Sequence, residues 1–232
     1  SSFMPIATSL TKLPLSETQS VQVEFGFTCD LCHMALSAPR RKSSRRLSLV
    51  RTTVTSPTEL CVIDTDGRNE KKLTAYNEAL NSEVAWADAE RFTYKSVSNR
   101  EIEGWLMKPL GYQPGRKYPL VLYIHGGPHS QYNEGWFDEF QNLAGAGMMV
   151  LYTNPRGSAG YGADFTYAIR GRWGDEDYVD LMKAIDLMVA RPDVDSTRMG
   201  VTGGSYGGFM TGWITTKNRR FAAAQVDRAD MN

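Results

Sequence analysis

The second half of the chain is organised as apolar runs separated by stretches of helical periodicity. Residues 118–125 (YPLVLYIH) and 148–154 (MMVLYTN) are apolar at almost every position. Such runs are typical of strands that are covered on both faces in a parallel sheet. Two shorter strands are predicted at residues 199–203 (MGVTG) and 221–226 (FAAAQV).

Helices are predicted between these strands. Residues 133–147 (NEGWFDEFQNLAGAG) and 175–190 (DEDYVDLMKAIDLMVA) repeat apolar side chains at a spacing of three and four, and residues 207–217 form a third candidate helix. The first of these helices is expected to carry Trp136, Phe137, Phe140 and Leu143 on one face. Strands that alternate with helices indicate a doubly wound α/β fold, in which ligands bind beyond the carboxyl ends of the strands.

The first half of the chain has a different pattern. Residues 58–64 (TELCVID) and 71–74 (KKLT) flank an Asp-Gly turn and predict an antiparallel hairpin. A second hairpin is expected from residues 91–109, around the turn residues SNR. We therefore divide the chain into an unassigned segment, 1–57, a β-hairpin unit, 58–84, and an α/β unit, 85–232.

Composition limits the partners. The chain has 232 residues, 41% of them hydrophobic, which is enough for a sizeable core. Lys plus Arg and Asp plus Glu are balanced at 26 each, so no net charge would attract nucleic acid or an anionic membrane. The sequence contains no apolar run long enough to span a membrane and begins with no recognisable export signal, so we expect a cytoplasmic protein.

Two short motifs in the first 57 residues admit more than one interpretation. Cys29, Cys32 and His33 form a C-x-x-C-H pattern, which is compatible with covalent haem attachment or, with Cys61, with a zinc site. We interpret it as a chance match and predict no cofactor and no metal. The basic run at residues 40–46 (RRKSSRR) is interpreted as a solvated loop rather than a nucleic-acid or sorting patch.

A candidate nucleophile follows the predicted strand at residues 199–203. Gly203, Ser205 and Gly207 form a G-x-S-x-G motif, with a strand before it and a helix after it. This context is typical of a sharp turn that presents a serine hydroxyl above a sheet. The flanking glycines remove Cβ atoms that would collide in such a turn. Ser205 is therefore predicted to be a nucleophile.

A second glycine motif, residues 125–129 (HGGPH), follows the strand predicted at 118–125. Acyl transfer creates an oxyanion that needs preorganised N–H donors, and glycines allow the backbone to approach it closely. We predict the backbone N–H groups of Gly127 and Tyr206 as these donors. An acyl compound would be the substrate.

Four segments together resemble the prolyl oligopeptidase family of serine peptidases, and most closely its acylaminoacyl-peptidase-like members. They are YIHGGPHSQY, TNPRGSAGYG, GRWGDEDYVDL and VTGGSYGGFMTGW, in this order. Residues 58–80 are similar to the end of the β-propeller that precedes the catalytic domain in that family. The resemblance implies an α/β-hydrolase fold and hydrolysis of short or N-blocked peptides by a Ser-Asp-His triad. Ser205 matches the family nucleophile, and Tyr206 and Gly127 match its oxyanion donors.

The sequence also departs from the family. The family aspartate and histidine follow the nucleophile, but no histidine follows Ser205. We expect the chain to be truncated at both ends relative to the family and to be nearly inactive alone. We also expect the outer edge of the strand at 221–226 to be unpaired, which favours self-association.

The residues of this chain that could replace the triad aspartate and histidine are Asp227, His125 and His129. His125 and His129 are expected to brace the oxyanion loop rather than to act as a base. Asp227 occupies a place where some hydrolases of this fold carry their acid, but it has no histidine to orient. A carboxylesterase-type hydrolase and a non-catalytic interaction module stay as alternative functions.

Overall fold

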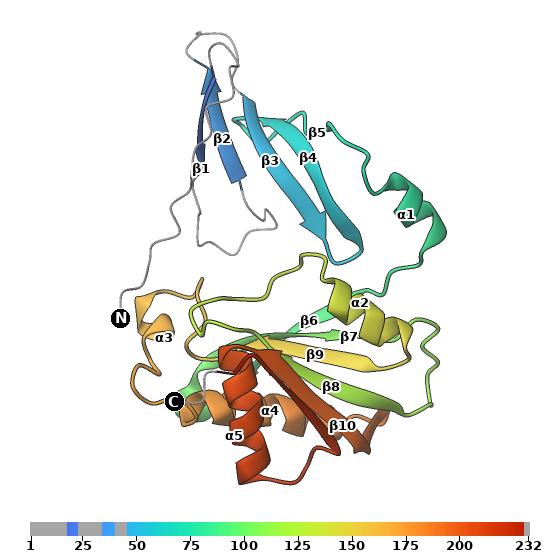
Figure 1. Ribbon diagram of the computed structural model, residues 1–232, viewed down its shortest axis with the longest axis vertical. Helices are drawn as coiled ribbons and strands as arrows, with labels where there is room; N and C mark the ends of the chain where they lie inside the picture. Colours follow the sequence, from blue (N-terminus) through green and yellow to red (C-terminus); the bar gives the residue numbers. More distant parts are fainter. Residues whose placement is uncertain (1–17, 23–33, 40–45, 230–232) are drawn as a thin grey trace.

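The computed structural model describes residues 18–22, 34–39 and 46–229, which form two β-sheets, one above the other in Figure 1. The C-x-x-C-H motif at 29–33 and all but the last residue of the basic run at 40–46 lie outside these residues. The predictions made for them are therefore not tested.

The first sheet has five strands in sequence order, each antiparallel to the next. Its strands are β1 (Thr18–Gln22), β2 (Met34–Pro39), β3 (Arg46–Thr53), β4 (Ser56–Asp64) and β5 (Lys71–Lys72), and the short helix α1 (Glu78–Glu83) follows. Strand β4 alternates buried and more exposed residues, and Leu49, Cys61 and Ile63 form a small core. The hairpin predicted from Thr58 onward is present, but the sheet also includes strands before that residue.

The second sheet has six strands in the order β11-β10-β8-β9-β7-β6. They are β6 (Ala89–Lys95), β7 (Glu101–Met107), β8 (Tyr118–Ile124), β9 (Met149–Asn154), β10 (Val194–Gly204) and β11 (Ala223–Asp227). Strands β11, β10, β8 and β9 are parallel, and β7 and β6 add an antiparallel edge. The mostly parallel α/β sheet predicted from the apolar runs is confirmed.

Helices cover both faces of this sheet (Figure 1). They are α2 (Asp138–Gly145), α3 (Ala163–Thr166), α4 (Glu176–Val189) and α5 (Tyr206–Lys217), with the 3-10 turn η1 (Val97–Asn99) after β6. In strand β9, Leu151 packs in the core that includes α4 and α5, whereas Tyr152 packs in the core that includes α2. Alternate residues of one strand therefore serve opposite faces, which is why the run is apolar throughout.

Helix α2 is shorter than the sequence predicts. It begins at Asp138, so Trp136 and Phe137 precede it instead of lying on its face. The backbone N–H of Trp136 donates to Oγ1 of Thr52 in β3 (3.0 Å), and that of Gly135 donates to Oδ1 of Asn133 (2.8 Å). These bonds satisfy the backbone outside a helix, and one of them links the loop to the first sheet.

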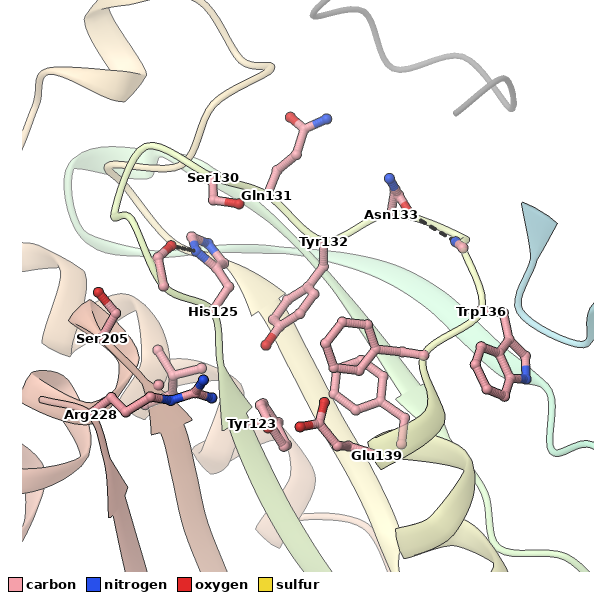
Figure 2. Close-up of a pocket in the computed structure, with 16 residues that line it drawn as sticks. Tyr123, His125, Ser130, Gln131, Tyr132, Asn133, Trp136, Glu139, Ser205 and Arg228 are labelled. Carbon is pink, nitrogen blue, oxygen red and sulfur yellow. Dashed lines mark hydrogen bonds between the residues drawn. The ribbon is translucent and has the colours of Figure 1, made fainter. Parts of the chain in front are cut away.

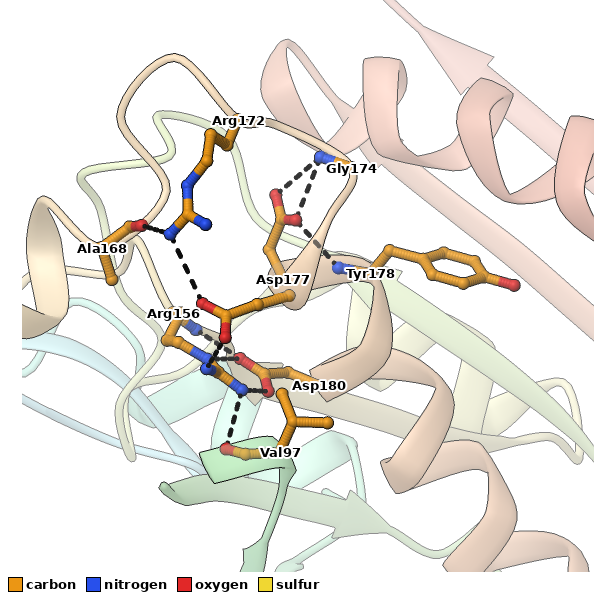
Figure 3. Close-up of polar contacts among 9 residues, drawn as sticks. Val97, Arg156, Ala168, Arg172, Gly174, Asp177, Tyr178 and Asp180 are labelled. Atoms are coloured by element: carbon orange, nitrogen blue, oxygen red, sulfur yellow. Dashed lines mark hydrogen bonds and ion pairs between the residues drawn. The ribbon is translucent and has the colours of Figure 1, made fainter. Parts of the chain in front are cut away.

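The loop after β9 is fixed by a buried ion pair, shown in Figure 3. Nη2 and Nε of Arg156 donate to the two carboxylate oxygens of Asp180 in α4, at 2.7 and 3.0 Å. The backbone N–H of Arg156 bonds to the same carboxylate, and Glu176 accepts from Nη1 at 3.0 Å. The Asp180 side chain is fully buried and that of Arg156 is 3% exposed, so each charge depends on its partner.

Loss of Asp180 should therefore destabilise the protein strongly. We expect Asp180→Ala to lower the free energy of unfolding by about 3–5 kcal/mol, because it leaves the buried guanidinium with only the partly exposed Glu176 as a counter-ion. Asp186→Ala is a matched control on the same helix, since Asp186 pairs with Arg220 at the surface. Its cost should stay below about 1 kcal/mol. Chemical denaturation measures both, and equal losses would contradict this assignment.

Candidate active site

Ser205 lies in a strained turn between β10 and α5. Its backbone has φ 57° and ψ −120°, a combination that is unfavourable for a residue with a side chain. Both flanking glycines are required. A Cβ on Gly203 would lie 2.4 Å from the carbonyl oxygen of Ile124 at the end of β8, and one on Gly207 would lie 2.1 Å from it. The G-x-S-x-G motif thus forms the sharp turn that the sequence predicts.

Hydrogen bonds hold this turn on both sides. The N–H of Ser205 donates to the carbonyl of Asp227 at the end of β11 (3.1 Å), and the N–H of Phe209 donates to the carbonyl of Ser205 (2.9 Å). Tyr206 is the first residue of α5, so its N–H has no acceptor within the helix. This N–H is free to point out of the helix start, beside Ser205.

The side chain of Tyr206 is anchored by a residue whose role the sequence did not reveal. The Tyr206 hydroxyl donates to Oδ2 of Asp177 at 2.6 Å. Asp177 is fully buried and also accepts from the N–H groups of Gly174 and Tyr178 (Figure 3). Burial raises the pKa of Asp177. The sequence gives no signal for this contact, because Asp177 and Tyr206 are 29 positions apart.

The HGGP loop lies directly against Ser205. A Cβ on Gly126 would be 3.4 Å from the Cβ of Ser205. Gly127 has φ 120°, and a Cβ there would be 2.5 Å from the backbone nitrogen of His129, so glycine is required at this position too. The structure therefore brings Gly127, Ser205 and Tyr206 to the same edge of the sheet.

Both described histidines hold the loop. Nδ1–H of His125 donates to the carbonyl of Gly126 (2.7 Å), and its Nε2 lies 2.8 Å from Oγ of Ser158. Burial lowers the pKa of His125 to about 4, so the imidazole is neutral at pH 7. Nδ1–H of His129 donates to the carbonyl of Gly157 at 3.0 Å. Within residues 46–229, no histidine hydrogen-bonds to Ser205.

Asp227 supports the turn through its backbone rather than its side chain. Its carbonyl accepts from Ser205, while its carboxylate pairs with the guanidinium of Arg228 (Nε to Oδ2, 2.8 Å). No described histidine hydrogen-bonds to this carboxylate.

A cavity of about 540 Å³ opens beside the nucleophile, with Ser205 at one end and Trp136 at the other (Figure 2). Part of its wall is formed by the aromatic rings of Tyr123, Tyr132, Phe137 and Phe140. Arg228 and Glu139 supply one charge of each sign. Burial and the Glu139 carboxylate raise the pKa of Tyr123 to about 12. The cavity combines an apolar wall with a few polar groups, as expected of a binding site for a small ligand or peptide.

The described residues also bear on the prediction of no metal and on membrane insertion. In the part of the chain that the structure describes, no cluster of three or more His, Cys, Asp or Glu could hold a metal ion. Cys61 is a buried free thiol whose pKa is raised by burial. None of the helices formed by the described residues is long and apolar enough to cross a membrane.

The parallel strand order, the strained serine turn and the glycine loop facing it define an α/β-hydrolase fold. The comparisons identify the family. Residues 136–231 match the sequence pattern of the prolyl oligopeptidase family. The chain carries part of a peptidase domain that belongs to this family.

Known proteins similar to this chain include peptidases from bacteria and archaea. The uncharacterized peptidase YuxL of Bacillus subtilis is 46% identical over 76% of this chain and 27% of its own length. An acylaminoacyl peptidase of Pyrococcus horikoshii has a TM-score of 0.72 with 35% identity, over 78% of this chain and 29% of that one. An acylaminoacyl peptidase in complex with Z-Gly-Gly-Phe-chloromethyl ketone has a TM-score of 0.77 with 29% identity, over 92% of this chain and 38% of that one. The chain thus spans about a quarter to two-fifths of the length of these relatives.

Strain at Ser205 can be measured directly. We expect Ser205→Gly to raise the free energy of unfolding by about 1 kcal/mol, because glycine adopts a positive φ without the steric cost that a side chain incurs. Ser205→Ala keeps the Cβ and should leave stability close to that of the original chain. Urea denaturation of the three proteins provides the comparison. If the glycine variant is no more stable than the alanine variant, the turn is not strained.

Proposed function

We propose that this chain carries the nucleophile and the oxyanion donors of a serine peptidase that cleaves short or N-blocked peptides. The observation that carries the proposal is the strained turn at Ser205, packed directly against the Gly126–Gly127 loop. Strain of this kind persists where the surrounding structure imposes it, and it is concentrated at functional sites.

The chemistry proposed is acyl transfer. Oγ of Ser205 attacks the carbonyl carbon of the peptide bond, and a C–O bond forms as the carbonyl oxygen becomes an oxyanion. The N–H groups of Gly127 and Tyr206 donate to this oxyanion. The C–N bond then breaks, and the proton from Ser205 leaves with the amine. Water hydrolyses the acyl-enzyme and restores the serine.

The proton of Ser205 requires a base. His125 is buried, neutral and engaged with Gly126 and Ser158, and His129 is engaged with Gly157. We therefore propose that the 232-residue chain alone has little peptidase activity, although the strained turn at Ser205 is formed. Without a base, the residual acceleration over water is about 10³–10⁴-fold in other serine peptidases.

The substrate class is supported by the cavity and by the relatives. Aromatic walls beside Ser205 suit an apolar group of a peptide, and the cavity volume of about 540 Å³ suits a short one. One relative was solved with a Z-blocked tripeptide chloromethyl ketone, and others bear the name dipeptidyl-peptidase 5. Hydrolysis of small activated esters by the same groups stays as an alternative.

Fluorophosphonate labelling tests the nucleophile without requiring peptide turnover. Oγ of Ser205 displaces fluoride from phosphorus, and the tagged serine is identified by mass spectrometry. We expect slow labelling of the 232-residue chain, confined to Ser205. Added imidazole can enter the open cavity as a base and should increase the labelling rate by about tenfold.

The controls separate the nucleophile from the other hydroxyls of the cavity. Ser205→Ala should abolish labelling, whereas Ser130→Ala, which removes a second serine from the same cavity, should leave it unchanged. Fast labelling without imidazole would show that the chain already contains a base. Labelling that survives in Ser205→Ala would refute the nucleophile and favour a non-catalytic module.

A further inference from the structure

A second cavity, of about 450 Å³, lies near the nucleophile but does not include it. Its wall is formed by His129, Arg170, Gly171, Trp173 and Phe209. These residues come from three segments: the HGGP loop, the segment between α3 and α4, and the first turn of α5. We refer to it as the Arg170 pocket.

The Arg170 pocket shares residues or contacts with the Ser205 turn and with the HGGP loop. Phe209 lies one turn after Ser205, and its N–H donates to the Ser205 carbonyl at 2.9 Å. The ring of Trp173 packs on that of Tyr206, with 5.0 Å between centroids, and on that of Phe209, with 5.6 Å. His129 is two residues after Gly127. A peptide bound at Ser205 therefore has a neighbouring group within reach of this pocket.

The charge of the pocket has one sign. Arg170 is exposed, and its guanidinium makes no ion pair or side-chain hydrogen bond with any residue in the described ranges. By contrast, nearby Arg172 donates to the carbonyl of Ala168 and pairs with Glu176. No Asp or Glu lines the pocket. The five N–H donors of the Arg170 guanidinium are thus available to an acceptor supplied by a ligand.

The other residues that line the pocket favour a hydrogen-bond acceptor that is carried by a short aliphatic chain. Trp173 and Phe209 present ring surfaces that can cover methylene groups. Nδ1–H of His129 is committed to the carbonyl of Gly157, which leaves Nε2 as the nitrogen facing a ligand or solvent. Guanidinium groups bind carboxylates in a bidentate manner, with planar donors that match the two oxygens.

We propose that the Arg170 pocket binds a carboxylate of the substrate peptide, next to the bond that Ser205 attacks. The inference rests on the proposed function for its placement, but binding itself does not require Ser205. The carboxylate comes from a glutamate or aspartate side chain, or from the end of the peptide chain. Substrates with such a group adjacent to the cleaved bond are preferred.

Binding to the 232-residue chain can be followed through the indole N–H signal of Trp173 in nitrogen-15 NMR spectra, assigned with Trp173→Phe. Three probes are compared: acetyl-glutamate amide, acetyl-glutamine amide and acetyl-alanine with a free carboxylate. We expect both carboxylates to shift the Trp173 signal and the neutral glutamine probe to bind about tenfold more weakly. The tighter carboxylate identifies its source as a side chain or a chain end.

Substitutions locate the binding group. Arg170→Ala should weaken binding of the better carboxylate probe by about tenfold, and Arg170→Lys should restore part of it, because the charge returns without the bidentate donors. Arg219→Ala is a matched control, since it removes another exposed arginine beyond the opposite end of α5. It should leave binding unchanged.

Equal binding of the glutamate and glutamine probes would overturn the proposal, as would unchanged binding in Arg170→Ala. Ser205→Ala keeps the pocket intact and should bind the probes normally. Carboxylate binding without fluorophosphonate labelling would therefore refute the nucleophile and leave the pocket standing. Labelling without carboxylate binding would refute the proposal for the Arg170 pocket and support Ser205 as the nucleophile.

Discussion

The close approach of the end of β8 to the turn after β10 is the constraint on which the candidate site depends. The carbonyl oxygen of Ile124 occupies the space that a Cβ at Gly203 or Gly207 would need. The chain can pass this point only through glycines, with Ser205 held at a positive φ between them. The same approach brings Gly126 into contact with Ser205. Packing of two strand ends thus produces both the exposed hydroxyl and its neighbouring loop.

Helix α4 contributes the polar supports of this arrangement. Asp180 holds Arg156, and Asp177 holds the hydroxyl of Tyr206, the residue after the nucleophile. Both carboxylates are fully buried and each has several donors. Buried polar groups are costly unless they are satisfied, so these contacts select one arrangement of the loops around the site. The geometry of the candidate site therefore depends on residues that do not line its cavity.

Much of the fold could be predicted from the sequence, because it rests on local patterns. Continuous apolar runs identified β8 and β9, and the helical repeat identified α4. The extent of α2 could not be predicted, because Trp136 bonds to Thr52, a residue 84 positions earlier. The strands before Thr58 were missed for a related reason: β3 has one buried position, Leu49, and depends on its pairing with β4.

The site was partly predictable in the same sense. The glycine motifs after two strands indicated the positions of Ser205, Tyr206 and Gly127. Where a Cβ atom would collide with the backbone, glycine is required, and the fixed spacing of these glycines can be recognised in the sequence. The contact of Asp177 with Tyr206 and the pocket at Arg170 depend on tertiary packing between distant segments and leave no such spacing. The three-dimensional arrangement adds these residues to the account of the site.

The proposed site requires the N–H groups of Gly127 and Tyr206 to converge on the oxygen of a tetrahedral adduct at Ser205. A crystal structure of the chain with a peptide boronic acid would show whether they do, because boron forms a tetrahedral adduct with a serine hydroxyl. We predict a bond from Oγ of Ser205 to boron, with one boronate oxygen about 2.7–3.1 Å from both nitrogens. A boronate that is bound elsewhere, or whose oxygens point away from both N–H groups, would contradict it.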